Sequence, residues 1–325
     1  MKLNYKKMGK KLILLAGIVS CALFSCTYES VIELMPPTLP TQKTEVKFSS
    51  RIIIPGPSNS RIIGELWETG DAIGMYMVEK NSYSVVEGSS NIRYVTKKSC
   101  YTCNFVASDD FIYYPEDGRE VRFMSYYPHN ESTKGTTYKI DVSNQIPQSK
   151  LAFLYSFNSI ASYDKNVDVE NVPIEFNHQM TKIHINVKNA GNLQGYDLMN
   201  MKVYMTGLSS NADFNLMTGK ISNFKKSSHI YPSVLIAENG NVFSAEAIVI
   251  PESNLSSDAG IVFDLNNGNK NKKSDVYRWD LGETLEKGKK YTFNVAVNST
   301  GISVNTTIYD WFNISIDEEV GLRDR

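Results

Sequence analysis

The sequence predicts an all-β fold with two antiparallel β-sandwich domains in tandem. Three observations support this prediction. Apolar and polar residues alternate over much of the chain after residue 43, which is the pattern of strands with one buried face. Clusters of glycine, asparagine and aspartate separate these stretches, as they do in β-turns. The chain contains 19 tyrosines and almost no helical period, which argues against layers of helices packed on a sheet.

The first 25 residues have the composition of an export signal. Five lysines precede a mainly apolar stretch, residues 12–24, and no acidic residue occurs before Glu29. This stretch is shorter than the ~20 apolar residues that a transmembrane helix needs, but it fits the apolar core of a secretory signal. We therefore expect residues 1–25 to be a signal peptide.

Cys26 is the expected site of lipid attachment. The residues before it are Leu23, Phe24 and Ser25, so an aliphatic residue stands three positions before the cysteine and a small residue directly before it. This pattern is typical of a bacterial lipoprotein signal, in which the thiol receives diacylglycerol and the cysteine becomes the mature N-terminus. Cys21 is an alternative, although only nine residues of apolar core would then follow the last lysine. A cleaved signal with an incidental cysteine also remains open.

The rest of the chain divides into a tether and two domains. Residues 26–43 contain three prolines among polar residues, which predicts a flexible tether that holds the folded part away from the membrane. The alternating pattern lapses between residues 158 and 177 and then restarts. We therefore expect one domain over 44–165 and a second over 170–318.

The charge of the chain excludes nucleic acid as a partner. The full sequence has 34 basic and 35 acidic residues, and removal of the signal peptide takes away five lysines, which leaves a net charge of −6. Beyond Lys270, Lys272 and Lys273 there is no basic tract. Binding of phosphate backbones needs clustered lysine and arginine residues.

The clearest strands are predicted at residues 182–187, 291–298 and 301–308. In each of them apolar residues recur at alternate positions, which predicts an antiparallel strand with one face in a core and the other in water. The predicted inward residues are Ile183, Ile185 and Val187 in the first, Tyr291, Phe293, Val295 and Val297 in the second, and Ile302, Val304 and Ile308 in the third. A single short helix is possible at residues 193–200.

Turn sequences predict three hairpins. EDGR at 116–119 separates FIYYP from EVRFMSYYP, ENGN at 238–241 separates YPSVLIA from VFSAEAIVIP, and NNGNKNKK at 266–273 separates GIVFDL from DVYRWDL. Gly and Asn at these positions supply the left-handed conformations that tight turns require.

No arrangement of residues predicts catalysis, a cofactor or a metal site. The four histidines, His129, His178, His184 and His229, have no metal-ligand spacing, so solvated or locally hydrogen-bonded roles are favoured. The nucleophile elbow, the phosphate-binding loop and the dinucleotide fingerprint are all missing from the sequence. Carboxylates are numerous but scattered, and the chain is predicted not to be an enzyme.

Cys100 and Cys103 are predicted to be packed or surface thiols. The following CNFVA alternates like a strand, and in a strand residues three apart lie on opposite faces, ~10 Å apart, which is too far for a disulfide. One CxxC pair by itself is also weak evidence for zinc or redox chemistry.

The three tryptophans allow two interpretations. Trp67, Trp279 and Trp311 could form a platform on which a sugar stacks. The favoured prediction is that at least two are core anchors, because Trp67 and Trp311 stand at strand boundaries.

Two stretches of the sequence carry longer motifs. The first, residues 61–77, reads RIIGELWETGDAIGMYM and contains W-x-x-G-D-x-I-G followed by apolar residues. The second, residues 285–311, reads LEKGKKYTFNVAVNSTGISVNTTIYDW; it contains L-x-x-G-K-x-Y and ends in I-x-x-W. Both resemble segments of the Bacteroidetes fimbrillin family, the Mfa-like group of type V pilins. FIYYPEDGREVRFMSYYPH and EFNHQMTKIHINV look like middle segments of the same family.

The resemblance implies a fold, a location and a way of assembly. Family members have two transthyretin-like β-sandwiches and are lipoproteins of the outer membrane. In those that polymerise, an arginine-directed protease removes the first strand, and a strand of another pilin subunit fills its place. Carried over to this chain, Cys26 takes the lipid, residues 45–52 form the first strand, and Arg51 or Arg61 is the processing site, with Arg61 slightly preferred because proteases need an exposed loop.

One departure from the family leaves the role within a pilus open. Only 14 residues follow Trp311, which makes a donated strand short. A tip, anchor or accessory subunit is therefore as well supported as a stalk subunit, and a host surface or glycan is a further candidate partner. The alternative function is a glycan-binding outer-membrane lipoprotein of a polysaccharide-uptake system.

Overall fold

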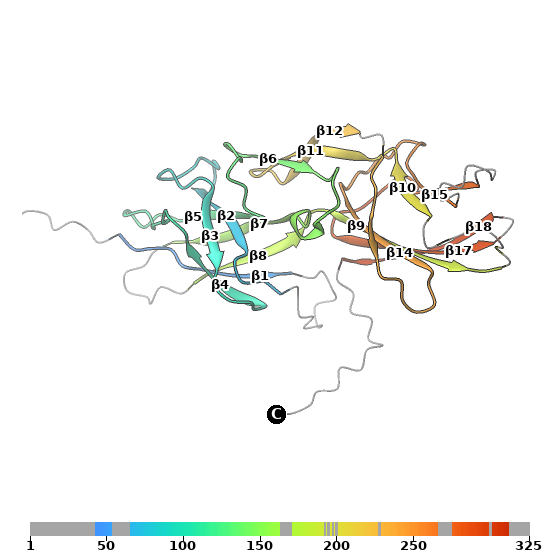
Figure 1. The fold of residues 1–325 in the computed structure, drawn as a ribbon. Coiled ribbons are helices and arrows are strands. Elements are labelled where there is room, and N and C mark those ends of the chain that lie inside the picture. The colour runs from blue at the N-terminus through green and yellow to red at the C-terminus, as the bar shows by residue number, and fades with distance from the viewer. Residues whose placement is uncertain are drawn as a thin grey trace, which may run out of the picture. The chain divides into compact units, whose positions relative to one another are not determined.

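The computed structural model describes residues 43–53, 66–162, 171–191, 193, 196, 198, 201–226, 229–265, 275–298 and 301–311. Within them the chain forms eighteen β-strands and one short 3-10 helix, η1 (Gln148–Lys150), all in one compact unit (Figure 1). The predicted all-β fold is confirmed. No helix among these residues has the length and apolar character needed to cross a membrane.

Seven strands form a closed N-terminal sheet. They are β1 (Phe48–Ile52), β2 (Ala72–Glu79), β3 (Ile92–Thr96), β4 (Thr102–Ala107), β5 (Val121–Tyr127), β7 (Leu154–Ala161) and β8 (Val172–His178). Their order is β1-β4-β3-β2-β5-β7-β8, and β1 closes the sheet by pairing with β4 on one side and β8 on the other. The β1–β8 pair is parallel, and the others in this sheet are antiparallel.

The remaining strands form three further sheets. Five strands follow the order β13-β14-β9-β17-β18, three follow β10-β15-β16, and three follow β12-β11-β6. These strands are β6 (Thr137–Asp141), β9 (Thr181–Asn189), β10 (Lys202–Thr206), β11 (Ser209–Asn215), β12 (Lys220–Lys226), β13 (Ser233–Leu235), β14 (Phe243–Val249), β15 (Gly260–Asp264), β16 (Val276–Asp280), β17 (Lys289–Asn298) and β18 (Gly301–Asp310).

Two apolar cores lie beneath these sheets. The first fills the closed sheet and includes Phe48, Trp67 and Phe123. The second is lined by the other sheets but also takes in Tyr126 of β5 and Tyr155 of β7. The aromatic side chains of the closed sheet therefore serve both cores, since successive residues of a strand point to opposite faces.

The alternating pattern predicted the central strands correctly. Burial along β9 and β17 alternates as expected from their sequences, and the hairpins β13–β14 and β15–β16 are antiparallel pairs. In β18, Ile302 and Val304 pack against the second core. The inward placement of Ile308 was wrong, because its side chain is 51% exposed.

Two further predictions need correction. Residues 111–115 form no strand and no hairpin with β5; instead Tyr113 makes an isolated bridge with Glu45, and β5 pairs with β2 and β7. The sheets are also not purely antiparallel, because β1–β8 and β9–β17 are parallel pairs. The short helix expected at 193–200 falls mostly outside the described residues.

The expected domain boundary is crossed by hydrogen bonds in two places. β8 lies beyond residue 170 but pairs with β1 and β7. β6 lies before residue 165 but pairs with β11. The division at 165/170 and the transthyretin-like sandwiches stay predictions.

Candidate functional site

The candidate site is built around the first strand. Along the segment 46–52 every second side chain points into the first core: Val46, Phe48, Ser50 and Ile52 are at most 6% exposed. Between them Arg51 lies on the outside. This alternation is the pattern expected of a strand with one buried face, and the first strand expected from the sequence is therefore present.

Hydrogen bonds hold this segment on both edges. β1 runs antiparallel to β4, from Phe48 opposite Phe105, and parallel to β8 over its full length. Beyond the strand, the N–H of Val46 donates to the carbonyl of Ile112 at 2.9 Å, and the N–H of Ile53 donates to the carbonyl of Phe176 at 2.7 Å. Figure 1 shows β1 between β4 and β8. Without β1, both neighbours would have an unpaired edge above an apolar groove.

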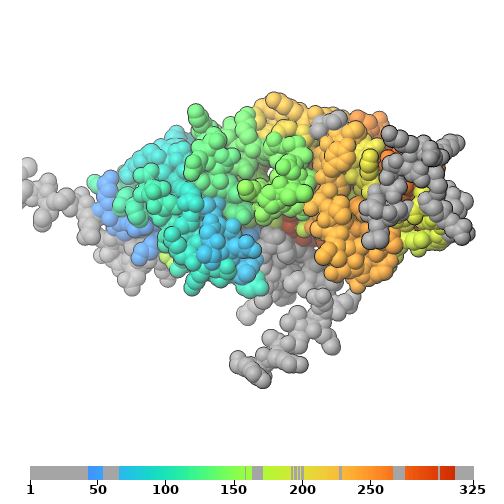
Figure 2. Space-filling view, in the orientation of Figure 1, coloured from blue at the N-terminus to red at the C-terminus, as the bar shows by residue number. Residues whose placement is uncertain are grey.

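The floor of this groove is aromatic. The ring of Phe48 meets the rings of Tyr94 and Phe123 edge-on, each with centroids 5.1 Å apart. Trp67 makes the same kind of contact with Phe105 of β4 at 5.2 Å and with Phe176 of β8 at 5.4 Å. Phe105 lies opposite Phe48 and Phe176 lies opposite Ile52, so Trp67 lies beneath β1 between its two neighbouring strands. It also lines a pocket together with Ile52. In Figure 2, residues 43–53 are the dark blue atoms, and only a small area of them is visible beside the cyan and green residues of the same sheet.

Ser50 is a polar residue in the middle of this apolar groove. Its side chain is buried, and its Oγ has no hydrogen-bond partner in the described part of the chain. A buried hydroxyl without a partner costs about 1–3 kcal/mol relative to a satisfied one. Ser50 was not predicted as a residue of this site, although the alternation of EVKFSSRI places it on the same face as Phe48 and Ile52.

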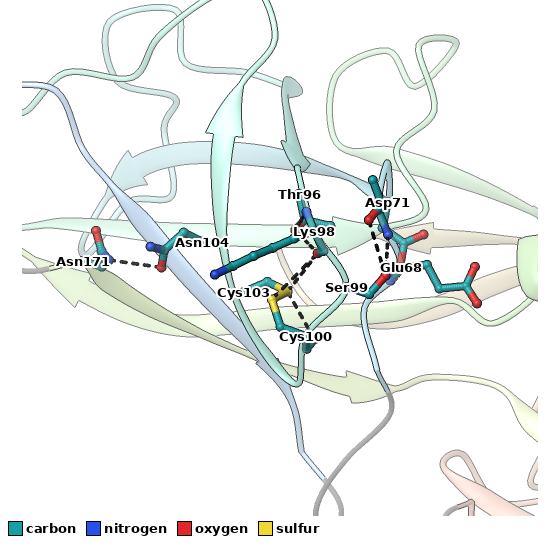
Figure 3. Close-up of a disulfide and its surroundings, with 10 residues drawn as sticks. Glu68, Asp71, Thr96, Lys98, Ser99, Cys100, Cys103, Asn104 and Asn171 are labelled. Carbon is teal, nitrogen blue, oxygen red and sulfur yellow. Dashed lines mark hydrogen bonds between the residues drawn. A yellow bond between two sulfur atoms is a disulfide. The ribbon is translucent and has the colours of Figure 1, made fainter.

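Cys100 and Cys103 form a disulfide, so the prediction of two free thiols was wrong. Their Cα atoms are 5.5 Å apart, within the range that a disulfide spans. The prediction failed because Cys100 is not part of β4, which begins only at Thr102. The bend between the two cysteines brings them to the same side (Figure 3), where the carbonyl oxygen of Lys98 lies 3.5 Å from the Sγ of Cys103.

The disulfide connects the floor of the groove to its wall. Cys100 exchanges two backbone hydrogen bonds of 3.1 Å with Trp67, while Cys103 lies on β4 directly opposite Ser50 of β1. The covalent bond therefore joins the segment that positions Trp67 to the strand that flanks β1.

Of the expected site residues, only Arg51 lies within the described part of the chain. It belongs to β1, and its Nε donates to Oε1 of Glu175 on β8 at 3.0 Å. Cys26 and Arg61 lie outside the described residues, so their roles stay predictions.

The tryptophans occupy core positions. Trp67 is 1% exposed, Trp311 is 6% exposed, and Trp279 packs partly buried against the second core. The core interpretation is confirmed for Trp67 and Trp311, whose ring faces are not open to a sugar. Trp311 stacks on His178 with ring centroids 4.5 Å apart.

A charged cluster lies on the polar side of β9 and its neighbours. The carboxylate of Glu246 on β14 lies 2.9 Å from Lys182 Nζ and 2.8 Å from His184 Nδ1. Lys290 Nζ lies 3.6 Å from Oε1 of the same carboxylate. Burial alone would raise the pKa of Glu246, but the hydrogen bond from His184 and the two lysines lower it to about 2. The local hydrogen bonding expected for His184 is confirmed. No group of three or more metal-ligating side chains occurs among the described residues.

Comparison with known proteins gives the family. The family model described as Fimbrillin-like matches residues 60–311. The chain belongs to the fimbrillin-like family. The resemblance seen in the sequence motifs is thereby confirmed, and the match includes Trp67, the disulfide and all strands from β2 to β18.

Relatives of this fimbrillin-like protein come from Bacteroides. A Bacteroides uniformis protein named as a fimbrium subunit is 27% identical over 261 residues, which are 78% of this chain and 81% of the relative. A crystal structure described as a cell adhesion protein of Bacteroides uniformis is 23% identical, with a TM-score of 0.62 over 82% of this chain and 98% of that one. A similar one from Bacteroides ovatus is 21% identical, with a TM-score of 0.61 over 83% and 99%. These two structures show that the fold is shared.

Proposed function

We propose that this fimbrillin-like protein is a lipid-anchored, non-enzymatic pilus subunit of the cell surface that contributes to adhesion. Its relatives named as a fimbrium subunit and as cell adhesion proteins support this proposal. The subunit joins other pilin subunits by exchanging its first strand for a strand of a neighbour. Attachment to the outer membrane uses the lipid on Cys26, and residues 26–43 form the tether.

The position of β1 carries the proposal. β1 is hydrogen-bonded on both edges and places Phe48 and Ile52 in the core. Each of these side chains contributes about 1.5–3 kcal/mol by its burial. Loss of β1 would expose that apolar surface together with the edges of β4 and β8, and an extended segment from another subunit satisfies both. The strand thus blocks polymerisation until it is removed.

Arg61 is the better processing site of the two arginines. Arg51 lies within a strand that is paired on both sides, and its guanidinium is bound to Glu175. A protease needs its substrate segment out of a sheet. Cleavage after Arg51 would also leave Ile52 attached to the main body, whereas cleavage after Arg61 releases all of β1.

Treatment of the purified protein, residues 27–325, with an arginine-specific protease tests the proposal. We expect mass spectrometry to show loss of the segment that ends at Arg61, followed by ladders of heat-resistant oligomers on denaturing gels. Arg61→Lys should block both events, because the protease does not cut after lysine. Arg51→Lys is the matched control and should assemble normally. Cleavage at Arg61 without any oligomer would reject strand exchange.

The lipid anchor is tested separately in cells. Labelled fatty acid should enter the wild-type chain and the Cys21→Ser control but not Cys26→Ser. Label in the Cys26→Ser chain would move the anchor to another residue, such as Cys21. Lack of label in the wild-type chain would remove the lipoprotein assignment.

A further inference from the structure

We propose that the groove of β1 continues past Ile52 into an apolar pocket, and that this pocket receives an apolar side chain of the incoming strand. The inference rests on the proposed strand exchange and adds a specificity site to it. The occupant is the residue two positions beyond the one that takes the place of Ile52.

A pocket of about 250 Å³ lies at this end of the groove. A cavity of ~150 Å³ is enough for a benzene ring, whereas one water takes only ~30 Å³ of liquid. The pocket therefore has room for one large aliphatic or aromatic side chain. Its apolar and aromatic lining consists of Ile52, Leu66, Trp67, Tyr127, Ala152 and Leu154.

The pocket shares residues with the groove. Ile52 belongs to β1 and also lines the pocket. Trp67 lines the pocket and contacts Phe105 and Phe176 on the two strands beside β1. When β1 leaves, Ile52 leaves with it, and the pocket opens into the vacated groove as one continuous apolar surface.

The spacing of strand residues selects the occupant. Phe48, Ser50 and Ile52 point inward because side chains alternate along a strand. The next inward position of a replacing strand lies two residues on, ~7 Å further along the groove. A strand that is longer than β1 at this end therefore places one more side chain over the pocket.

The rim of the pocket disfavours an acidic occupant. Glu68 and Asp71 both line it. The carboxylate of Asp71 already accepts hydrogen bonds from the hydroxyl of Tyr127 at 3.0 Å and from the N–H of Glu68 at 2.8 Å. A third carboxylate brought into the pocket would be desolvated beside these like charges. An uncharged apolar side chain fits the lining without that cost.

A second observation marks this end of the groove as incomplete. The indole Nε1 of Trp67 is buried and has no hydrogen-bond partner among the residues that the structure describes. Buried donors are nearly always paired in folded proteins. A backbone carbonyl of a strand that runs past Ile52 is a suitable acceptor, because a β-strand carries one carbonyl per residue.

Peptide exchange on the cleaved protein tests the pocket. After digestion the protease is inhibited, and the cleaved chain, with its N-terminal segment still bound, is mixed with fluorescent peptides. Each peptide consists of residues 44–53 of this chain followed by leucine, glycine or aspartate. Burial of a leucine side chain is worth about 1.5–3 kcal/mol. Fluorescence anisotropy should therefore show that the leucine peptide binds the cleaved protein with about 10–100-fold higher affinity than the glycine peptide. The aspartate peptide should bind no better than the glycine peptide.

A pocket-filling variant provides the control. Ala152→Phe should remove the preference for leucine while the glycine peptide still exchanges, and Ala190→Phe, at an exposed alanine outside the groove, should keep the preference. Equal binding of the three peptides to the wild-type protein would overturn the proposal that the pocket selects an apolar side chain, but it would leave the proposed strand exchange intact. Binding of none of them would overturn the proposed strand exchange itself.

Discussion

Ser50 lies directly opposite Cys103 across the β1–β4 pair. A buried hydroxyl without a partner is thus placed beside the disulfide-bonded wall of the groove. The first strand fits its site imperfectly at this position. In the proposed strand exchange, an incoming strand with an apolar residue there would avoid the cost of a buried, unpaired hydroxyl.

Ser50→Ala should stabilise the protein. The substitution removes a buried hydroxyl that makes no hydrogen bond, and the free energy of unfolding should rise by about 1 kcal/mol. Denaturant unfolding of the uncleaved chain measures this change. In the cleaved chain the same variant should release its N-terminal segment more slowly.

Ser125→Ala is the matched comparison. Ser125 is as deeply buried as Ser50, but its Oγ donates to the carbonyl of Gly74 at 3.1 Å. Removal of a satisfied hydroxyl leaves that carbonyl without its donor and should lower the free energy of unfolding by about 1 kcal/mol. A loss of stability in both variants would show that Ser50 has a partner in solution.

The disulfide should stabilise the protein modestly. A cross-link over so short a loop contributes about 2 kcal/mol in the chain-entropy description. The double variant Cys100→Ser, Cys103→Ser should therefore unfold at lower denaturant, and the change in tryptophan fluorescence should include Trp67, which pairs with Cys100. A reducing agent should shift the wild-type protein toward the variant and leave the variant unchanged.

The pKa of Glu246 predicts a loss of stability in acid. Burial raises this pKa, but the hydrogen bond from His184 and the charges of Lys182 and Lys290 lower it to about 2, below the ordinary value near 4.5. A carboxyl with a depressed pKa in the folded state adds stability that is complete above the unfolded pKa and lost as the pH falls toward the folded one. We expect about 3 kcal/mol to be lost between pH 5 and about 2.

Glu246→Gln separates this effect from general acid unfolding. The variant should be less stable at pH 7, because two lysines then face each other without their carboxylate. Its unfolding free energy should also change less than that of the wild type between pH 5 and pH 2. Parallel pH profiles for the two proteins would contradict the assigned role of Glu246.

Gly207 should tolerate no side chain. Its φ is +70°, and a Cβ there would lie 2.5 Å from backbone atoms of Asp258 and Ala259. Gly240 has a similar φ of +74° but no atom within 4 Å of the added carbon. Gly240→Ala should therefore cost only the backbone strain, about 1 kcal/mol, while Gly207→Ala should cost several times more. Equal melting temperatures for the two variants would contradict the close packing at Gly207.

The sequence predicted strands better than it predicted their partners. β9 and β17 followed from a period of two, because alternation reports which face of a strand is buried. The parallel pairing of these two strands, and of β1 with β8, could not be predicted from alternation. A strand buries the same face whether its neighbour runs parallel or antiparallel to it. Ile308 was misplaced for a related reason: its strand pairs on one edge with β17, and its apolar pattern continues where the core ends.

The candidate site was predicted only in part. The first strand was correctly located, but the motif that includes Trp67 gave no sign that this residue lies beneath β1. The disulfide was missed because the strand pattern of CNFVA was extended back to Cys100, whereas a bend intervenes. Contacts between residues distant in sequence, such as Trp67 with Phe176, depend on the packing of whole sheets.

The parallel β1–β8 pair has a consequence for the order of folding. Arg51 and Glu175, which face each other in this pair, are 124 residues apart in the chain. During synthesis the first strand emerges early, yet its second neighbour is made only after most of the sheet. Closing so long a loop is slow compared with forming local hairpins, so we expect the folding chain to pass through a stage in which β8 still lacks β1. In the proposed strand exchange, this stage would briefly resemble the cleaved subunit, and the covalent link between β1 and the rest of the chain would favour β1 over a strand from another subunit.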